Sequence, residues 1–478
     1  MPNPPAITID TITDTIADAR VGAASIARPA SVLIGGQGDR WIDDWRPEDV
    51  QFWTDGGERI ARRNLVFSVL TEHIGFSIWS MWSVIILFLG KNYGFDPAHK
   101  FLLTTMPVAV GSVLRIPYTF AVARFGGRNW TIFSTAILVV PCALTALVLK
   151  PGVSFNTLLA VAAVAGVGGG NFSSSIANID AFYPQRLKGW ALGLNAGGGN
   201  IGVAAVQLVG LAVLAVFGAS HPRVILAIYV PLILLATIGA ARSMDNLRTV
   251  TNDKGAMREV LHERHSWIIM LLYVGTFGSF IGFSFAFGQV LQVQFASTFD
   301  TPVKAASVTF LGPLIGSLIR PVGGRLADAI VGSFVTFWTF VAMACAATVV
   351  ITASQLDSLP LFIVGFTLLF VLSGLGNGST YKMIPAMFTS HAQLAVARGV
   401  PADEATRRAK RMSRALIGLA GAVGAFGGVL VNLSFREAFL TAKTGDAAYA
   451  VFIGLYVLCA SVTWLVYRRN RPGRLAGV

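Results

Sequence analysis

Residues 104–123, TTMPVAVGSVLRIPYTFAVA, form an apolar run long enough to cross a bilayer, yet this run contains Arg115. A second such run, VTFLGPLIGSLIRPVGG at residues 308–324, contains Arg320. A guanidinium near the centre of a membrane costs roughly 2.5–3.5 kcal/mol on insertion scales, and it stays charged there. Neither run holds an acidic residue, so the possible partners of each arginine are a buried carboxylate from another segment, helix-end carbonyls or a bound anion.

Both arginines stand four residues after a glycine in a Gly-Ser pair, so the two runs are an internal repeat. Their separation is 205 residues, and GVGGGN at 166–171 and GLGNGS at 374–379 repeat at 208 residues. Duplicated halves that enclose a site near the membrane midplane are typical of secondary transporters. The repeat therefore favours an anion-binding site on a transport axis.

The composition is that of an integral membrane protein. Of the 478 residues, 54% are hydrophobic and 13% are charged, whereas soluble domains carry about 25% charged residues. Apolar runs of about 20 residues, the length that spans the hydrocarbon layer, recur twelve times. The three cysteines lie far apart within these runs without the spacing of metal ligands, so we expect neither a metal nor a cofactor.

The formal charge of +13 lies mostly in the loops of one side. Because cytoplasmic loops are enriched in Lys and Arg, both termini are predicted to be cytoplasmic. The positive net charge is then explained by the orientation of the protein in the membrane, and we expect no nucleic-acid partner.

Two groups of six spans predict an all-α membrane protein with a 6+6 pseudo-symmetric fold. Residues 1–40 lack helical periodicity and are expected to be partly disordered, whereas WIDDWRPEDVQFW at 41–53 is expected at the membrane interface, with its tryptophans at headgroup level. The predicted divisions are a cytoplasmic arm (1–60), an N-terminal bundle (61–241), a linker (242–265), a C-terminal bundle (266–467) and a basic tail (468–478).

Several segments resemble known families. The loops RFGGR (124–128) and GGRLAD (323–328) resemble the glycine and charge motif of major facilitator superfamily transporters. Residues 166–207, from GVGGGNFSSSIANIDAF to the end of NAGGGNIGVAAVQ, closely resemble the signature region of the NarK-type nitrate/nitrite porter family in that superfamily. LRIPYTF (114–120) and YVGTFGSFIGFS (273–284) support this resemblance, which spans about residues 41–467.

The resemblance implies a substrate site at matching positions. Arg115 and Arg320 would hold the anion from opposite halves, Phe172 and Phe277 would flank it, and Tyr273 and Asn200 would supply hydrogen bonds. Asn171, Asn377 and Lys382 are weaker candidates. A planar guanidinium fork suits nitrate and nitrite because it donates two N–H bonds in one plane.

The expected function is nitrate import in exchange for nitrite export across the bacterial cytoplasmic membrane, by a multi-pass protein that is not an enzyme. Two arginine charges without an anion are costly to occlude, which favours exchange over return of an empty carrier. The expected partners are nitrate, nitrite and the lipid bilayer, and the protein is expected to be a monomer.

Three alternatives stay open. Glu72 and His73 in the first span can bind and release a proton, which would make the protein a proton-coupled nitrate symporter. The plainer interpretation is that both face water near the cytoplasmic end or pair with each other, and Lys382 can pair with Glu72 or Asp180. A porter for another small anion and a membrane-bound anion sensor are the remaining alternatives.

Overall fold

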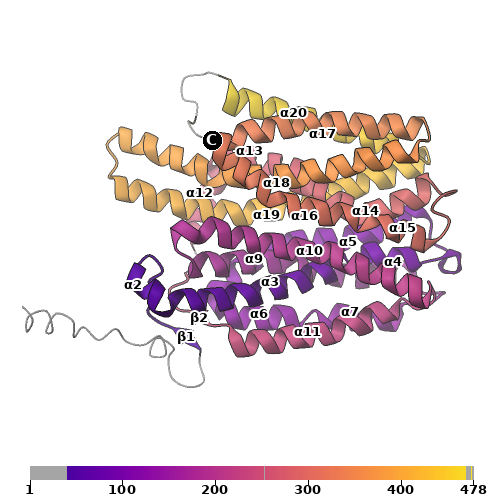
Figure 1. The fold of residues 1–478 in the computed structure, drawn as a ribbon, viewed down its shortest axis with the longest axis horizontal. Coiled ribbons are helices and arrows are strands. Elements are labelled where there is room, and N and C mark those ends of the chain that lie inside the picture. Colours follow the sequence, from indigo (N-terminus) through magenta and orange to yellow (C-terminus); the bar gives the residue numbers. More distant parts are fainter. Residues whose placement is uncertain (1–39, 252, 470–474, 476–477) are drawn as a thin grey trace, which may run out of the picture.

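The computed structural model describes residues 40–251, 253–469, 475 and 478, and this part of the chain folds into a bundle of long helices lying side by side (Figure 1). Within it, twelve helical segments are long and apolar enough to cross a membrane, from Val50–Phe88 to Asp446–Arg468. This confirms the predicted twelve-span, all-α fold.

The helices and strands are β1 (Trp41–Ile42), α2 (Val50–Phe52), α3 (Glu58–Ser80), α4 (Trp82–Phe88), α5 (Pro97–Phe125), α6 (Gly127–Ala136), α7 (Val139–Val148), α8 (Phe155–Val164), α9 (Val167–Phe182), α10 (Gln185–Phe217), α11 (Arg223–Ser243), β2 (Asn246–Leu247), α12 (Lys254–His262), α13 (Arg264–Tyr273), α14 (Ser279–Gln294), α15 (Pro302–Thr309), α16 (Leu311–Ile330), α17 (Gly332–Gln355), α18 (Leu359–Ala397), α19 (Ala402–Thr441) and α20 (Asp446–Thr463). Short π-helical turns at Trp53–Gly57, Val274–Gly278 and Trp464–Arg468 and a 3-10 turn at Lys91–Tyr93 complete the order.

Helix α5 shows why the spans begin and end where they do. The Asp96 carboxylate accepts a hydrogen bond from the His99 backbone N–H at 2.8 Å, and Pro97 stands at the first helical position, where an N–H is not needed. At the other end Gly126 adopts φ 86°, which stops the helix. Arg115 lies between these two ends, well inside the span.

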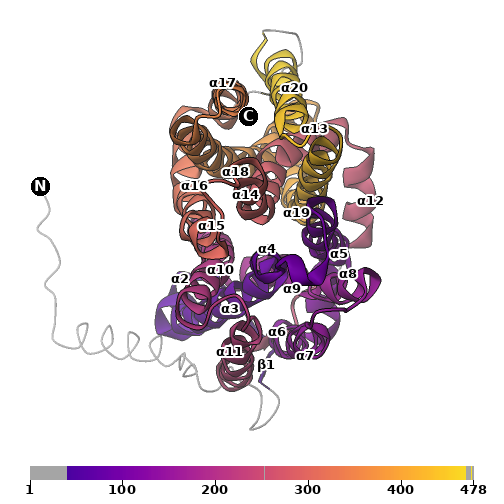
Figure 2. The ribbon, with the colours of Figure 1, turned by 90° about the vertical axis from the view of Figure 1, so that its right-hand side faces the viewer.

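The two groups of six spans lie side by side, with the helices of residues 50–243 below those of residues 264–468 in Figure 2. We call the end of the bundle that carries α2, α12 and the two strands the linker end, and the opposite end, which carries α4 and α15, the far end (Figure 1).

Contacts between the two halves are dense toward the far end. The rings of Phe101 and Phe439 stack at 5.5 Å, and the Thr104 hydroxyl donates to the Asn432 side-chain oxygen at 3.0 Å. At the linker end, by contrast, Arg414 of α19 reaches Asp180 of α9 at 2.7 Å while its own side chain stays 59% exposed. The far end is therefore sealed by buried packing, and the linker end is bridged by a solvated ion pair.

The segment before the first span packs onto the protein. Strand β1 pairs in parallel with β2, which begins the linker. Trp45 and Trp53 are 7% and 3% exposed, and the Trp45 indole donates to the Phe182 carbonyl at 3.2 Å. These two tryptophans thus pack against the ends of the helices, and their expected position at headgroup level stays a prediction. The predicted disorder of residues 1–39 lies outside the described residues, and the proposed domain divisions stay predictions.

A buried carboxylate joins the arm to the linker. Asp245, fully buried, accepts from Arg40 at 3.1 Å, from Arg63 at 2.6 Å and from the Asn64 amide at 3.0 Å, and its own backbone N–H donates to the Asn64 side-chain oxygen at 2.9 Å. These four residues come from the arm, the first span and the linker. The Asp245 carboxylate therefore holds three segments of the chain together.

Replacing Asp245 with Ala should lower the free energy of unfolding by about 2 kcal/mol, because two arginines and an amide lose their buried partner. Thermal unfolding in detergent, followed by tryptophan fluorescence, measures the effect. Asp43→Asn is the matched control, since Asp43 pairs with Arg248 at the surface with 70% of its side chain exposed. Equal stability of the Asp245 and Asp43 variants would contradict this role.

Candidate functional site

Arg115 of α5 lies fully buried between the two halves. Its Nε donates to the Gly169 carbonyl at 3.1 Å and its Nη1 to the Gly421 carbonyl at 2.8 Å. Gly421 belongs to α19, in the opposite half of the bundle. The remaining nitrogen, Nη2, is buried and has no hydrogen-bond partner within the described residues. Two helix carbonyls therefore hold the guanidinium in place and leave one edge free.

Aromatic rings surround the same guanidinium. Its carbon lies 4.6 Å from the ring centre of Phe172, 5.1 Å from that of Phe277 and 5.3 Å from that of Trp79. Ring faces attract a cation and exclude water, so they lower the cost of burying this charge.

Arg320 of α16 holds the corresponding position in the other half and is 6% exposed. Its Nη2 donates to the Tyr273 hydroxyl at 3.3 Å, and its guanidinium lies 5.5 Å from the ring centre of Tyr381. Its Nη1 is buried without a partner in the described part of the chain. Each arginine thus presents an unsatisfied N–H edge in a dry environment.

Phe172 and Phe277 join the two halves. Phe172 lies on α9 and Phe277 in the π-helical turn Val274–Gly278, and their rings stack at 6.3 Å with planes 27° apart. Tyr273 stacks on Phe277 at 5.2 Å, which links the rings to Arg320. These contacts bring Arg115, Arg320 and the stacked rings together where the two halves meet.

Three buried amides lack partners in this region of the described structure. Neither polar atom of the Asn200 or Asn377 side chain has a hydrogen bond, and the Asn171 side-chain oxygen has none. All three are at most 4% exposed. Leaving a buried polar group unpaired costs about 1–3 kcal/mol, so these groups are suited to meet a ligand or water in the working protein.

Close glycine contacts position the helices that carry the arginines. A Cβ added to Gly378 of α18 would lie 2.1 Å from the Arg320 carbonyl oxygen, and one added to Gly168 of α9 would lie 2.2 Å from the Gly75 carbonyl oxygen. Both contacts put the backbones closer than a methyl group allows. The glycine runs are therefore packing surfaces that let the helices carrying the arginines lie close to their neighbours.

Glu72 and His73 lie on α3 but meet different partners. Glu72 is 1% exposed, and one of its oxygens accepts from the Asn195 amide at 2.6 Å while the other has no hydrogen bond within the described residues. The His73 Nδ1 lies 3.1 Å from the Gly198 carbonyl. Glu72 neither faces water nor pairs with His73, contrary to the plainer interpretation of the sequence, because successive helical residues point in different directions.

Lys382 has a partner that the sequence analysis did not consider. Its ammonium contacts both oxygens of Asp328 on α16, at 2.8 and 2.9 Å. The expected pairing with Glu72 or Asp180 is absent among the described residues, because α16 and α18 pack together and bring Asp328 closer.

Sequence reasoning missed two further residues of this centre, Tyr381 and Trp79. The Tyr381 hydroxyl is buried without a partner among the described residues, and its ring lies 6.0 Å from that of Tyr273. Tyr381 stands next to Lys382, two residues after the GLGNGS repeat (374–379), so an aromatic beside a glycine-rich run was the available signal.

A separate cluster lies at the linker end. Atoms of Glu263, His265 and His391 that could bind a metal lie within 4.8 Å of one another. Two of them have a structural use: Glu263 caps α13 through the His265 N–H at 3.2 Å, and the His265 ring contacts the Tyr467 hydroxyl at 3.3 Å. We assign no metal to this cluster.

Comparison with known proteins gives consistent results. The Major Facilitator Superfamily profile matches residues 67–431. The chain is 36% identical to the nitrate/nitrite transporter NarU of Salmonella typhimurium, covering 90% of this chain and 97% of that protein, and 32% identical to the protein named "Probable nitrate/nitrite antiporter NarK2" of Thermus thermophilus, with the same coverage. The solved structure of a D-xylose–proton symporter aligns with a TM-score of 0.62 over 85% of this chain and 97% of that chain, at 14% identity, which concerns the fold alone.

Gly378→Ala should lower the free energy of unfolding by about 1–3 kcal/mol, since the new methyl would collide with the Arg320 carbonyl and push α16 away from α18. The control is Gly193→Ala in α10, where an added Cβ has no atom within 4 Å and helix propensity improves. Thermal unfolding of both purified variants tests this. A Gly378 variant as stable as the Gly193 variant would refute the packing argument.

Proposed function

This chain belongs to the nitrate/nitrite transporter family of the major facilitator superfamily, and from that premise we propose that it carries nitrate and nitrite by alternating access, chiefly importing nitrate in exchange for nitrite. The observation that carries the proposal is the pair of buried guanidinium groups, one from each half, each with a free N–H edge among the described residues. Arg115 and Arg320 are the proposed anion ligands.

The shape of the anion fits these surroundings. Nitrate and nitrite are planar and delocalised, so a guanidinium edge donates in their plane while Phe172 and Phe277 cover their faces. Tyr273 and Asn200 are the proposed neutral hydrogen-bond donors, and Asn171 and Asn377 are further candidates from the glycine-rich helices. Low local dielectric strengthens each charge-assisted bond.

Exchange follows from the charge of the empty site. Arg115 and Arg320 act on each other electrostatically, so occluding them without an anion is unfavourable. A bound anion offsets this repulsion, which makes the loaded carrier easier to reorient. Import of nitrate would then need export of nitrite.

The protein spans a bacterial membrane in many passes. We propose that this is the cytoplasmic membrane and that both termini and the linker end face the cytoplasm, as the Lys and Arg distribution of the loops indicates. With its far end sealed, the described structure would then be closer to the inward-facing state. A monomer contains both arginines and suffices for this mechanism.

Purified protein in liposomes tests the proposal directly. Nitrate uptake should depend on nitrite inside the vesicles and be indifferent to a pH gradient. Uptake into nitrite-free vesicles driven by an inward proton gradient would overturn exchange, and absence of any nitrate-dependent flux would overturn the transport proposal.

Arg115→Lys and Arg320→Lys should each reduce nitrate uptake about 10–100-fold, because an ammonium keeps the charge but loses the fork that reaches both the protein partner (the Gly169 and Gly421 carbonyls for Arg115, the Tyr273 hydroxyl for Arg320) and the anion. Counterflow of labelled nitrate in liposomes is the measurement. Arg407→Lys is the matched control, since Arg407 is exposed at the linker end of α19. Wild-type uptake by either site variant, with normal elution on size exclusion, would remove that arginine from the proposed site.

Proton-coupled nitrate symport is the second candidate, and the environment of Glu72 favours it. This carboxylate is buried, has one oxygen without a hydrogen bond within the described structure, and is under the electrostatic influence of both Arg115 and Arg320. An acid near an anion site is a plausible proton carrier in a membrane. His73, 3.1 Å from the Gly198 carbonyl, is the neighbouring titratable group.

Under symport, Glu72→Gln should abolish the acceleration of nitrate uptake by an inward proton gradient while leaving nitrate binding intact, because glutamine keeps the hydrogen bond but cannot ionise. Uptake at several imposed gradients, alongside binding by tryptophan quenching, separates the two effects. Glu437→Gln, at a carboxylate that is 60% exposed, is the control. An unchanged response to the gradient would exclude Glu72 as the proton carrier.

A further inference from the structure

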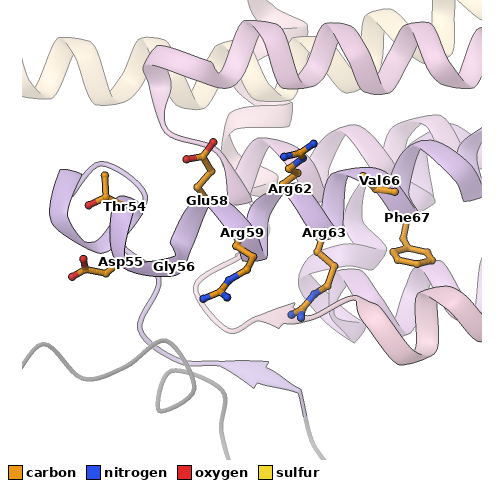
Figure 3. A pocket seen from close by; sticks show the side chains of 9 residues that line it. All are labelled: Thr54, Asp55, Gly56, Glu58, Arg59, Arg62, Arg63, Val66 and Phe67. Carbon is orange, nitrogen blue, oxygen red and sulfur yellow. The ribbon is translucent and has the colours of Figure 1, made fainter.

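A pocket of about 690 Å³ lies at the linker end, outside the anion site (Figure 3). It is formed where the chain turns at Gly56, with φ 157°, and enters the first turns of α3. Arg59, Arg62 and Arg63 line it together with Val66 and Phe67. The pocket combines cations with apolar surface at the start of a membrane span.

Two of these cations are available to a ligand. Arg59 and Arg62 are exposed, and neither side chain makes an ion pair or hydrogen bond within the described residues. Arg63 is committed to Asp245 at 2.6 Å, although its Nε is buried without a partner there. Figure 3 shows Arg59 and Arg63 extending to the same side of α3, with Arg62 on the other side. On the side of α3 that carries Arg59 and Arg63, Arg59 is therefore the guanidinium with no partner within the described residues.

The pocket changes character along its length. In Figure 3, Asp55 lies at one end, Arg59 and Arg63 lie in the middle, and Val66 and Phe67 lie at the other end. Val66 is 54% exposed, and Leu70, one helical turn further, is 41% exposed. These residues begin the apolar run of the first span. The order from water toward the membrane is thus carboxylate, guanidinium and apolar side chain.

An aminophospholipid has the complementary order: a primary ammonium, a phosphodiester and acyl chains. Asp55 lies before the turn at Gly56 and Arg59 lies in the first turn of α3, so a carboxylate and a guanidinium line one pocket in the order of an ethanolamine ammonium and its phosphate. A phosphodiester accepts two hydrogen bonds from one guanidinium, and the acyl chains can follow the exposed apolar stripe.

We propose that this pocket binds the headgroup of a phosphatidylethanolamine-type lipid, with Arg59 on the phosphate and Asp55 on the ammonium. The site adjoins Arg63, and through it Asp245, the carboxylate that ties the arm to the linker. An occupant here lies against the junction of arm, first span and linker. The inference concerns the lipid surface and does not depend on the transported anion.

Native mass spectrometry of the delipidated full-length protein tests the proposal, with phosphatidylethanolamine, phosphatidylcholine and phosphatidylglycerol titrated separately. Phosphatidylethanolamine should bind most tightly. Arg59→Gln should weaken its binding about fivefold, the effect of one basic residue at a membrane surface, and Arg407→Gln should not change it. Asp55→Asn should remove the preference for phosphatidylethanolamine over phosphatidylcholine, whose ammonium cannot donate a hydrogen bond.

Three results would overturn the proposal. Wild-type phosphatidylethanolamine affinity in Arg59→Gln would remove the phosphate contact. Equal or tighter binding of phosphatidylglycerol would replace the aminolipid by a simple anionic lipid. Equal binding of soluble phosphoethanolamine, supplied without acyl chains, would identify the ligand as a water-soluble phosphate ester. Normal elution of each variant on size exclusion shows that folding is intact.

Discussion

Two permanent cations in a membrane interior are the constraint on which this structure depends. A guanidinium cannot be neutralised by losing its proton, so its surroundings must supply compensation. Arg115 obtains part of it from the Gly169 and Gly421 carbonyls and from three nearby aromatic rings, and Arg320 from Tyr273 and Tyr381. The compensation is incomplete, since each group keeps an unpaired nitrogen among the described residues. That residual deficit is what an anion can fill.

The same groups link substrate to movement. Arg115 is on α5 but donates across the interface to Gly421 of α19, and the rings of Phe172 and Phe277 stack across it. An anion that draws the Arg115 guanidinium toward itself would therefore compete with a bond between the halves. Glycine contacts permit such motion because backbones that touch without side chains between them can slide. On the proposed mechanism, anion binding and reorientation of the halves therefore depend on the same contacts.

Local patterns and long-range contacts differ in how far the sequence predicts them. The spans, the repeat and the burial of both arginines follow from apolar run length and spacing, which are properties of neighbouring residues. The partners do not: Gly421 lies 306 residues from Arg115, and Asp328 lies on a different helix from Lys382. Residue type suggested a membrane interface for Trp45 and Trp53, but it could not show that both side chains are buried against the protein, with the Trp45 indole donating to the Phe182 carbonyl. Such choices depend on which helices meet, and no local pattern contains that information.

Glu72 changes the balance between exchange and symport. With this carboxylate ionised, the two arginines and Glu72 sum to one positive charge when the site is empty and to zero with one bound anion. An exchanger always reorients in the neutral, loaded form. A symporter loaded with an anion and a proton carries one positive charge, the same as its empty form, so both of its reorientations meet a similar electrostatic cost. Without Glu72 the empty form would hold two charges, and only exchange would avoid that penalty. On this proposal the charge of Glu72 sets whether the empty carrier can return, and the Asn195 amide, which donates to Glu72 at 2.6 Å, holds that carboxylate in place.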